Sequence, residues 1–111
     1  MLNKKYYKNK LIDQLNDIDL ATLKKKEISI FNNSKILITG ASGLMGINLL
    51  FFFNKLIVEK KLSINVDGTY NTSIFDFVKT YFNKNKKINF YKINLTKKNI
   101  SKNKKYDFIF H

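Results

Sequence analysis

Cysteine, arginine and proline are absent from the 111-residue chain, and histidine occurs once, as His111. Without cysteine the chain can form neither a disulfide framework nor a thiolate metal site, and one histidine cannot build a histidine cluster. The sequence therefore predicts no metal centre. The lack of proline leaves glycines and polar clusters as the only local signals that separate one element from the next.

The absence of arginine affects what the positive net charge implies about binding partners. All 21 basic side chains are lysines, against 8 acidic ones, which gives a net charge of +13. Such a charge raises nucleic acid as a partner, because cations that neutralise phosphates release counterions. Specific recognition of bases and phosphates depends strongly on the guanidinium fork, however. We therefore expect no specific nucleic-acid partner and keep a lysine-rich nucleic-acid binder as an alternative.

Targeting and membrane signals are also missing. No apolar segment follows Lys4 and Lys5, so the beginning of the chain does not resemble a secretory signal. The most apolar stretch, residues 44–58, is interrupted by Asn48 and Lys55 and is shorter than the roughly 20 residues that span a bilayer. We expect a cytoplasmic protein without a membrane partner, and a buried helix over this stretch.

Alternating strand and helix patterns begin near residue 34. Apolar β-rich runs predict strands over residues 36–39, 64–70, 88–95 and 106–110. Helical spacing predicts helices over residues 44–58 and 74–82, the second preceded by a capping box of Ser73 and Asp76. Alternation of this kind predicts a parallel sheet with right-handed crossovers, in the order 3-2-1-4. We expect the two helices on opposite faces of that sheet.

The first 33 residues differ from the rest. They form a lysine-rich extension that we expect to be partly helical, with apolar residues at helical spacing between 11 and 18, and to pack on the domain of residues 34–111. Residues 24–26, followed by 32–34, are interpreted as a connection between the two parts.

Three glycines lie where the first predicted strand gives way to the first helix. Gly40 permits a tight turn, Gly43 lets a pyrophosphate approach the backbone, and Gly46 lets the helix lie close to the strand. The N–H groups near Leu44 and Met45 then face the phosphates from the positive end of the helix dipole. A glycine turn in an unrelated α/β fold is the alternative, but the flanking strand and helix favour a dinucleotide site.

This motif belongs to a wider resemblance. Residues 35–46 (KILITGASGLMG), 66–70 (VDGTY), 94–96 (NLT) and 106–111 (YDFIFH) resemble the extended short-chain dehydrogenase/reductase family, which includes sugar-nucleotide epimerases and dehydratases. The resemblance implies an α/β fold with a Rossmann-like, doubly wound parallel sheet, here expected to be truncated after the fourth strand. It also implies NAD(P)-dependent hydride transfer at a sugar carbon. The nucleotide-sugar substrate is expected to bind through a missing C-terminal part, and the full-length protein to be a homodimer.

The resemblance also implies which residues bind the cofactor. They are Thr39, Gly40, Ser42, Gly43, Leu44, Met45, Gly46, Tyr70, Asn71, Asn94 and Leu95. Asn94 stands where the family commonly has an aspartate that accepts from the adenine amino group; an amide oxygen can also accept that bond, and a plain turn residue is the alternative.

The choice between NAD and NADP depends on the end of the second strand. NAD users usually have an acidic residue there, where this chain has Tyr70, and Asp67 lies earlier in the strand. NADP users commonly have a basic residue nearby, and none occurs from residue 64 to 78. We expect NAD, with NADP as the alternative.

The family's catalytic pair is not predicted in this chain. A Tyr-x-x-x-Lys pair on a later helix supplies the general acid/base in the family, because its lysine and the cofactor lower the tyrosine pKa. The only such spacing here, Tyr6 with Lys10, precedes the first strand and is not assigned to catalysis. His111 is interpreted as a strand-end residue, so we expect an N-terminal cofactor-binding part, with a non-catalytic dinucleotide-binding module as the alternative.

Overall fold

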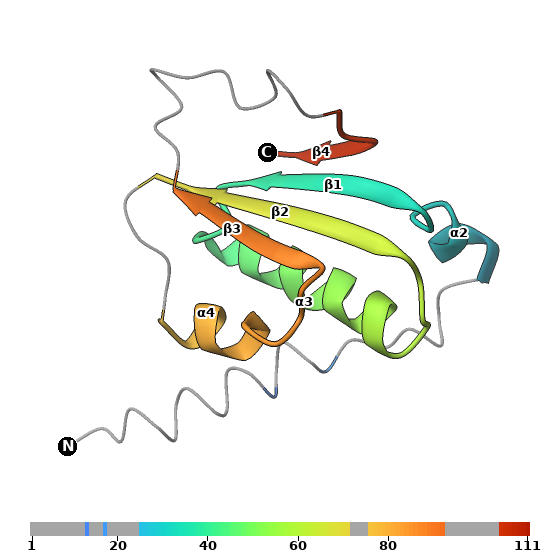
Figure 1. The fold of residues 1–111 in the computed structure, drawn as a ribbon, viewed down its shortest axis with the longest axis horizontal. Helices are drawn as coiled ribbons and strands as arrows, with labels where there is room; N and C mark the ends of the chain where they lie inside the picture. The colour runs from blue at the N-terminus through green and yellow to red at the C-terminus, as the bar shows by residue number, and fades with distance from the viewer. Residues whose placement is uncertain (1–12, 14–16, 18–24, 72–75, 93–104) are drawn as a thin grey trace.

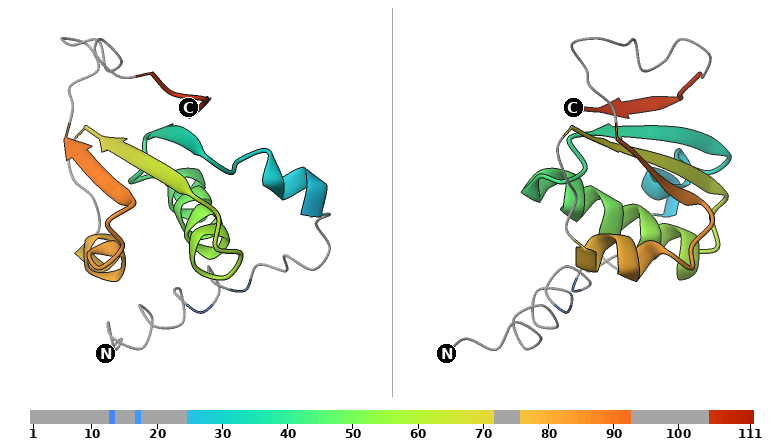
Figure 2. Two further views of the ribbon diagram at one scale, coloured as in Figure 1. Left: turned by 45° about the vertical axis from the view of Figure 1, so that its right-hand side comes forward. Right: turned by 60° about the vertical axis from the view of Figure 1, so that its left-hand side comes forward.

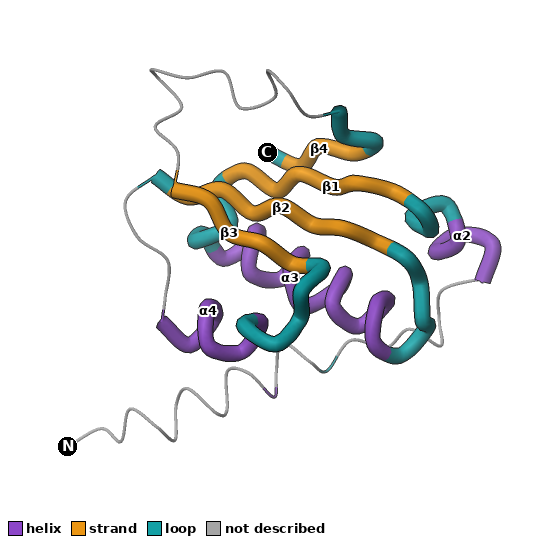
Figure 3. Tube along the Cα trace, in the orientation of Figure 1, coloured by secondary structure: helices purple, strands orange, loops and turns teal. Residues whose placement is uncertain are grey.

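Four short β-rich runs form one parallel sheet in the computed structural model, which describes residues 13, 17, 25–71, 76–92 and 105–111 (Figure 1). The elements follow one another as α2 (Lys25–Ser29), β1 (Ser34–Thr39), α3 (Leu44–Val58), β2 (Ile64–Tyr70), α4 (Asp76–Phe82), β3 (Ile88–Lys92) and β4 (Phe108–Phe110). The alternation of strands and helices along the tube in Figure 3 is that of an α/β protein.

The strand order is β3-β2-β1-β4, and every neighbouring pair is parallel. β1 pairs with β2 from Ser34 opposite Ile64 to Thr39 opposite Thr69, so the two strands end together. The predicted order 3-2-1-4 is therefore confirmed. Because all four strands run the same way, their carboxyl ends meet at one edge of the sheet (Figure 1).

The prediction of helices on opposite faces is wrong. α3 and α4 lie on the same face of the sheet (Figure 2), and the rings of Phe51 and Phe82 meet with their centroids 4.9 Å apart. The physical reason is the direction of the crossovers. The steps from β1 to β2 and from β2 to β3 move the same way across the sheet, so two right-handed connections place both helices on one side.

The core lies between the sheet and α3. Alternate residues of the strands, such as Ile36, Ile38 and Val66, point toward the helices and are fully or almost fully buried. α3 contributes Phe51 and Phe53, both fully buried. The remaining buried side chains of the core are Ile28, Ala41, Ile47, Leu50, Leu56, Ile64, Val78, Phe82 and Ile88.

The predicted element bounds agree closely with the structure for α3 and β2. α3 is nevertheless not buried all round, because Leu44, Met45 and Val58 at its two ends are exposed. β4 is shorter than predicted. The Asp107 backbone N–H donates to the Lys35 carbonyl, and the Lys35 backbone N–H donates to the Asp107 carboxylate. Asp107 therefore contacts the start of β1 before the pairing of β4 with β1 begins. The predicted ends at Ser73, Ile74 and residues 93–95 lie outside the described residues.

The connection predicted around residues 24–26 is partly a helix. α2 begins at Lys25 and ends at Ser29, and it buries Ile28 in the core. Phe31, just after it, packs edge-on against Phe53 with ring centroids 5.2 Å apart. Tertiary burial of this kind stabilises a helix too short to persist alone, which local sequence signals do not reveal. No helix in the described ranges is long and apolar enough to cross a membrane.

Candidate functional site

The glycine turn lies at the carboxyl edge of the sheet, between the end of β1 and the start of α3. Two backbone hydrogen bonds fix it. The Ala41 N–H donates to the Thr69 carbonyl of β2 at 2.8 Å, and the Gly43 N–H donates to the Gly40 carbonyl at 3.0 Å. The turn is thus held both to the neighbouring strand and to itself, which sets the position at which α3 begins.

Gly40 makes the turn possible through its backbone conformation. Its φ is +68°, in the left-handed region that side chains with a Cβ disfavour, and a Cβ built there would meet nothing within 4 Å. The requirement for glycine at this position is therefore conformational and not a matter of space.

Gly46 is required for a different reason. A Cβ at Gly46 would lie far inside contact distance of the Gly40 carbonyl oxygen and 2.8 Å from the Ala41 Cα atom. Both are backbone atoms of the fixed turn, so they cannot move aside cheaply. The absence of a side chain on Gly46 lets the first turn of α3 lie directly against the end of β1, as the sequence predicted.

Gly43 has no such neighbour. A Cβ there would lie 3.4 Å from the Gly40 carbonyl oxygen, an ordinary van der Waals distance, and its φ of −79° and ψ of 167° are open to any residue. Neither the backbone nor the packing of the chain demands glycine at this position. The space in front of Gly43 opens to solvent, where a ligand could approach the backbone.

The first turn of α3 presents its backbone N–H groups at this edge. Gly43 is the N-cap and provides no side-chain hydrogen bond, and the first turn contains no acidic residue. The N–H groups of the first turn have no acceptor within the helix, and they carry the positive end of its dipole. Leu44 and Met45 are 73% and 72% exposed, and Ser42 is half-buried beside them. This combination can hold an anionic group such as a phosphate.

Thr39 is turned toward β4. Its hydroxyl donates to the Phe110 carbonyl at 3.3 Å and lies 3.0 Å from His111 Nδ1. The side chain therefore joins the ends of β1 and β4, and its predicted contact with a cofactor is not evident from this geometry. The neighbouring Thr69 hydroxyl is buried, with no hydrogen-bond partner among the described residues.

Tyr70 and Asn71 lie at the end of β2, as predicted, with Tyr70 half-buried and Asn71 exposed. The structure adds a residue that sequence reasoning missed: Lys79 of α4 places its ammonium 5.4 Å from the centre of the Tyr70 ring. Lys79 directly follows residues 64–78, in which no basic residue occurs. The order of the elements could have indicated this lysine, because a helix that follows a parallel strand is connected to the carboxyl end of that strand.

Asp67 does not belong to this edge. It pairs with Leu37 in mid-sheet, and its carboxylate accepts a 2.7 Å hydrogen bond from the Tyr106 hydroxyl. Burial, together with the hydrogen bond and the charge of Asp67, raises the pKa of Tyr106 above its ordinary value. Asp67 and Tyr106 therefore stabilise the face of the sheet opposite the helices, and Asp67 lies in the middle of β2, before the end of the strand, as the sequence predicted.

Asn94 and Leu95, the other predicted cofactor-binding residues, lie outside the described residues, as do Tyr6 and Lys10. Within the described ranges no group of three histidine, aspartate or glutamate side chains could hold a metal ion.

Comparisons with protein-family models, curated proteins and solved structures return no match.

Proposed function

We propose that this chain is the NAD(P)-binding, N-terminal part of a sugar-nucleotide epimerase or dehydratase of the extended short-chain dehydrogenase/reductase type. In this proposal the glycine turn receives the cofactor pyrophosphate. The first-turn N–H groups of α3 donate to its oxygens, and Tyr70 and Asn71 line the side of the adenosine ribose. The bound cofactor would accept and return hydride at a sugar carbon.

The difference between Gly43 and Gly46 carries the proposal. The fold itself accounts for Gly46, since a Cβ would strike the Gly40 and Ala41 backbone. The fold does not account for Gly43, where a Cβ meets only ordinary contact distance. A pyrophosphate seated on the turn supplies the missing reason, because its oxygens need to come close to the backbone at that point.

The finer description of the fold belongs to the same proposal. A Rossmann-like, doubly wound sheet has helices on both faces, and α3 and α4 cover one of them. The four parallel strands and their order are compatible with such a sheet. The proposal assigns the family's Tyr-x-x-x-Lys pair to no residue of this chain. It places the nucleotide sugar on a C-terminal part of the full-length protein, which we propose to be a cytoplasmic homodimer.

NAD is the cofactor we propose, and the position of Lys79 favours NADP as a second candidate. A cation beside Tyr70 would be attracted to the 2′-phosphate that distinguishes NADP from NAD, and the last residue of β2 is Tyr70 rather than the acidic residue that NAD users usually have there. The two cofactors therefore test the role of this lysine directly.

Titration with NADH and NADPH, followed by the fluorescence of the reduced nicotinamide, tests the proposal in the full-length protein. We expect saturable binding of NADH, with ADP as a competitor. Lys79→Gln should weaken NADPH binding about threefold or more and leave NADH nearly unchanged, because only NADPH has the 2′-phosphate. Lys105→Gln is the matched control, an exposed lysine that lies on another segment. Failure of both dinucleotides to bind would contradict the proposed function.

Turnover separates the enzyme from a non-catalytic dinucleotide-binding module. The full-length protein, loaded with cofactor, is incubated with a panel of nucleotide sugars, and the products are separated by chromatography. Conversion of a nucleotide sugar supports the enzyme. Cofactor binding without conversion of any member of the panel favours the module.

A further inference from the structure

The carboxyl ends of β1 and β4 lie next to each other at the edge of the sheet that carries the glycine turn (Figure 1). The strand order reverses at this point, because the chain moves from β1 to β2 and β3 and then returns to β4 on the other side of β1. In open α/β sheets, ligands bind outside the carboxyl ends of the strands at such a reversal. Thr39, the last residue of β1, and His111, which directly follows β4, both lie there.

The Thr39 side chain holds the ring of His111. The Thr39 hydroxyl donates to the Phe110 carbonyl at 3.3 Å and lies 3.0 Å from His111 Nδ1. A hydroxyl has one hydrogen, so a hydroxyl that donates to the carbonyl can only accept from the ring. Nδ1 therefore carries a hydrogen, and in the neutral ring Nε2 is left as the acceptor.

Nε2 of His111 is available to a ligand. Thr39 is buried, whereas His111 is exposed. Within the described ranges the His111 ring has no hydrogen-bond partner other than Thr39. An acceptor nitrogen binds a group that donates a hydrogen, so it matches a hydroxyl and not the oxygen of an ionised phosphate. The ring therefore complements the N–H groups of the glycine turn, which match the phosphate.

If the glycine turn receives a dinucleotide, the strand order also indicates where its two nucleosides lie. In the proposed function the pyrophosphate lies at the end of β1, and Tyr70 and Asn71 at the end of β2 line the adenosine ribose. The second nucleoside extends from the pyrophosphate in the opposite direction, which in the order β3-β2-β1-β4 is toward β4. Its ribose then lies beside His111.

We propose that His111 binds the ribose of the second, nicotinamide-bearing nucleoside, with Nε2 accepting a hydrogen bond from a ribose hydroxyl. This role rests on the proposed function, because it needs a dinucleotide on the glycine turn. Thr39 is then a positioning residue, which fixes the His111 ring and does not touch the cofactor itself. This accounts for a threonine hydroxyl that ends β1 and yet bonds to the end of β4.

Calorimetric titration of the full-length protein with NADH, ADP-ribose and ADP tests the proposal. ADP-ribose keeps the second ribose without the nicotinamide, and ADP lacks both. His111→Phe should bind NADH and ADP-ribose about fivefold more weakly, the typical effect of one neutral hydrogen bond, and should bind ADP as wild type does. His111→Gln, whose amide oxygen can also accept a hydrogen bond, should lose less than His111→Phe.

The positioning role of Thr39 has a matched control on the neighbouring strand. Thr39→Val keeps the shape of the side chain and removes the hydroxyl, so it should weaken NADH and ADP-ribose binding about threefold and leave ADP binding unchanged. Thr69 pairs with Thr39 in the sheet and is also buried, but its hydroxyl has no hydrogen-bond partner among the described residues. Thr69→Val should bind all three ligands as wild type does. A purely structural role for Thr39 would weaken ADP binding as much as NADH binding.

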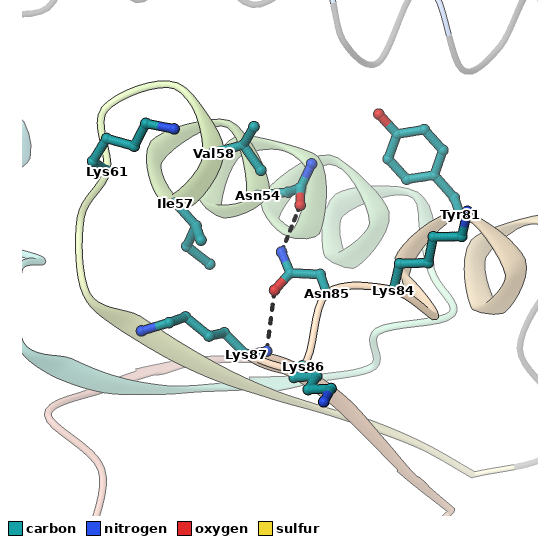
Figure 4. Close-up of a pocket in the computed structure, with 9 residues that line it drawn as sticks. All are labelled: Asn54, Ile57, Val58, Lys61, Tyr81, Lys84, Asn85, Lys86 and Lys87. Atoms are coloured by element: carbon teal, nitrogen blue, oxygen red, sulfur yellow. Dashed lines mark hydrogen bonds between the residues drawn. The ribbon is translucent and has the colours of Figure 1, made fainter.

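A second control tests whether these anionic ligands bind elsewhere on the chain. A lysine-rich hollow lies at the other end of α3, beside the loop that leads into β3 (Figure 4). Lys84→Gln together with Lys86→Gln removes two of the four lysines that line it. We expect the affinity for all three ligands to stay within about twofold of wild type, because charges this far from the glycine turn are screened by salt. A common loss for all three would place the ligands in the hollow and overturn the proposal.

Three results for His111→Phe would also overturn the proposal. Equal losses for NADH and ADP would mean that the ring supports the edge of the sheet and does not touch the second ribose. A loss for NADH alone would move the contact to the nicotinamide, and unchanged affinity for all three ligands would mean that the ring contacts none of them. These results differ from failure of the proposed function, in which the wild-type protein binds none of the three ligands.

Discussion

The two halves of the glycine turn differ in what surrounds them. The inner half, Gly46 against Gly40 and Ala41, is filled by the backbone of the chain, so no side chain fits. The outer half, from Gly43 to Met45, faces open space. Glycines in one motif can therefore be required for different reasons: the inner glycine by the packing of the chain, and the outer one, in our proposal, by a ligand.

Replacing Gly46 should have the largest effect on stability. In Gly46→Val the new side chain strikes the Gly40 carbonyl oxygen and the Ala41 Cα atom, so the start of α3 has to move away from β1. We expect a loss of about 3 kcal/mol or more in the free energy of unfolding. Urea denaturation followed by circular dichroism measures it. A variant as stable as wild type would show that the inner half of the turn is not tightly packed.

Replacing Gly40 separates the cost of the left-handed backbone conformation from the cost of a steric clash. Gly40→Ala meets no neighbouring atom but forces a Cβ into the left-handed region. We expect a loss of about 1 kcal/mol, because the cost of that conformation is partly offset by a less flexible unfolded chain. Gly40→Asn should lose less, since asparagine tolerates this conformation better. Equal losses in the two variants, again measured in urea, would contradict a conformational role.

Sequence patterns were sufficient for the elements that bury a continuous apolar face. The bounds of α3 and β2 follow from local apolar runs ended by glycine and polar residues, and the strand order follows from right-handed crossovers. The positions of Gly40, Gly43 and Gly46 in the candidate site could likewise be predicted, because a strand, a tight turn and a helix follow one another without interruption.

The features that sequence reasoning missed depend on contacts between distant segments. α2 is stabilised by the burial of Ile28, and the Lys79 ammonium of α4 lies over the Tyr70 ring of β2. The Thr39 hydroxyl donates to the Phe110 carbonyl of β4, 71 residues away in sequence. Local sequence patterns do not predict contacts between segments that are distant in the sequence.

A substitution on the face of the sheet opposite the helices serves as a control for the variants of the glycine turn. Tyr106→Phe removes the hydrogen bond to Asp67 and should lower the free energy of unfolding by about 1 kcal/mol at neutral pH, without affecting NADH binding.

The pH dependence of this change has a definite sign. The fold raises the pKa of Tyr106, chiefly through burial, so it favours the protonated phenol. That stabilisation is complete below the ordinary tyrosine pKa of about 10 and is lost as the pH rises above it. The difference between wild type and Tyr106→Phe, followed by urea denaturation at several pH values, should shrink above pH of about 10. A constant difference would contradict the assignment.

NADH and NADPH titration of Gly43→Val and Gly43→Ser, beside urea denaturation of the same variants, tests the central claim most directly. Both put a Cβ where the fold has room, so stability should stay within about 1 kcal/mol of wild type, and serine, a favoured N-cap residue, should equal or exceed it. Both should nevertheless lose at least about tenfold in cofactor affinity, with valine losing more, because the Cβ holds the pyrophosphate away from the N–H groups of α3. If Gly43→Val binds either cofactor as tightly as wild type, the glycine turn does not receive the pyrophosphate.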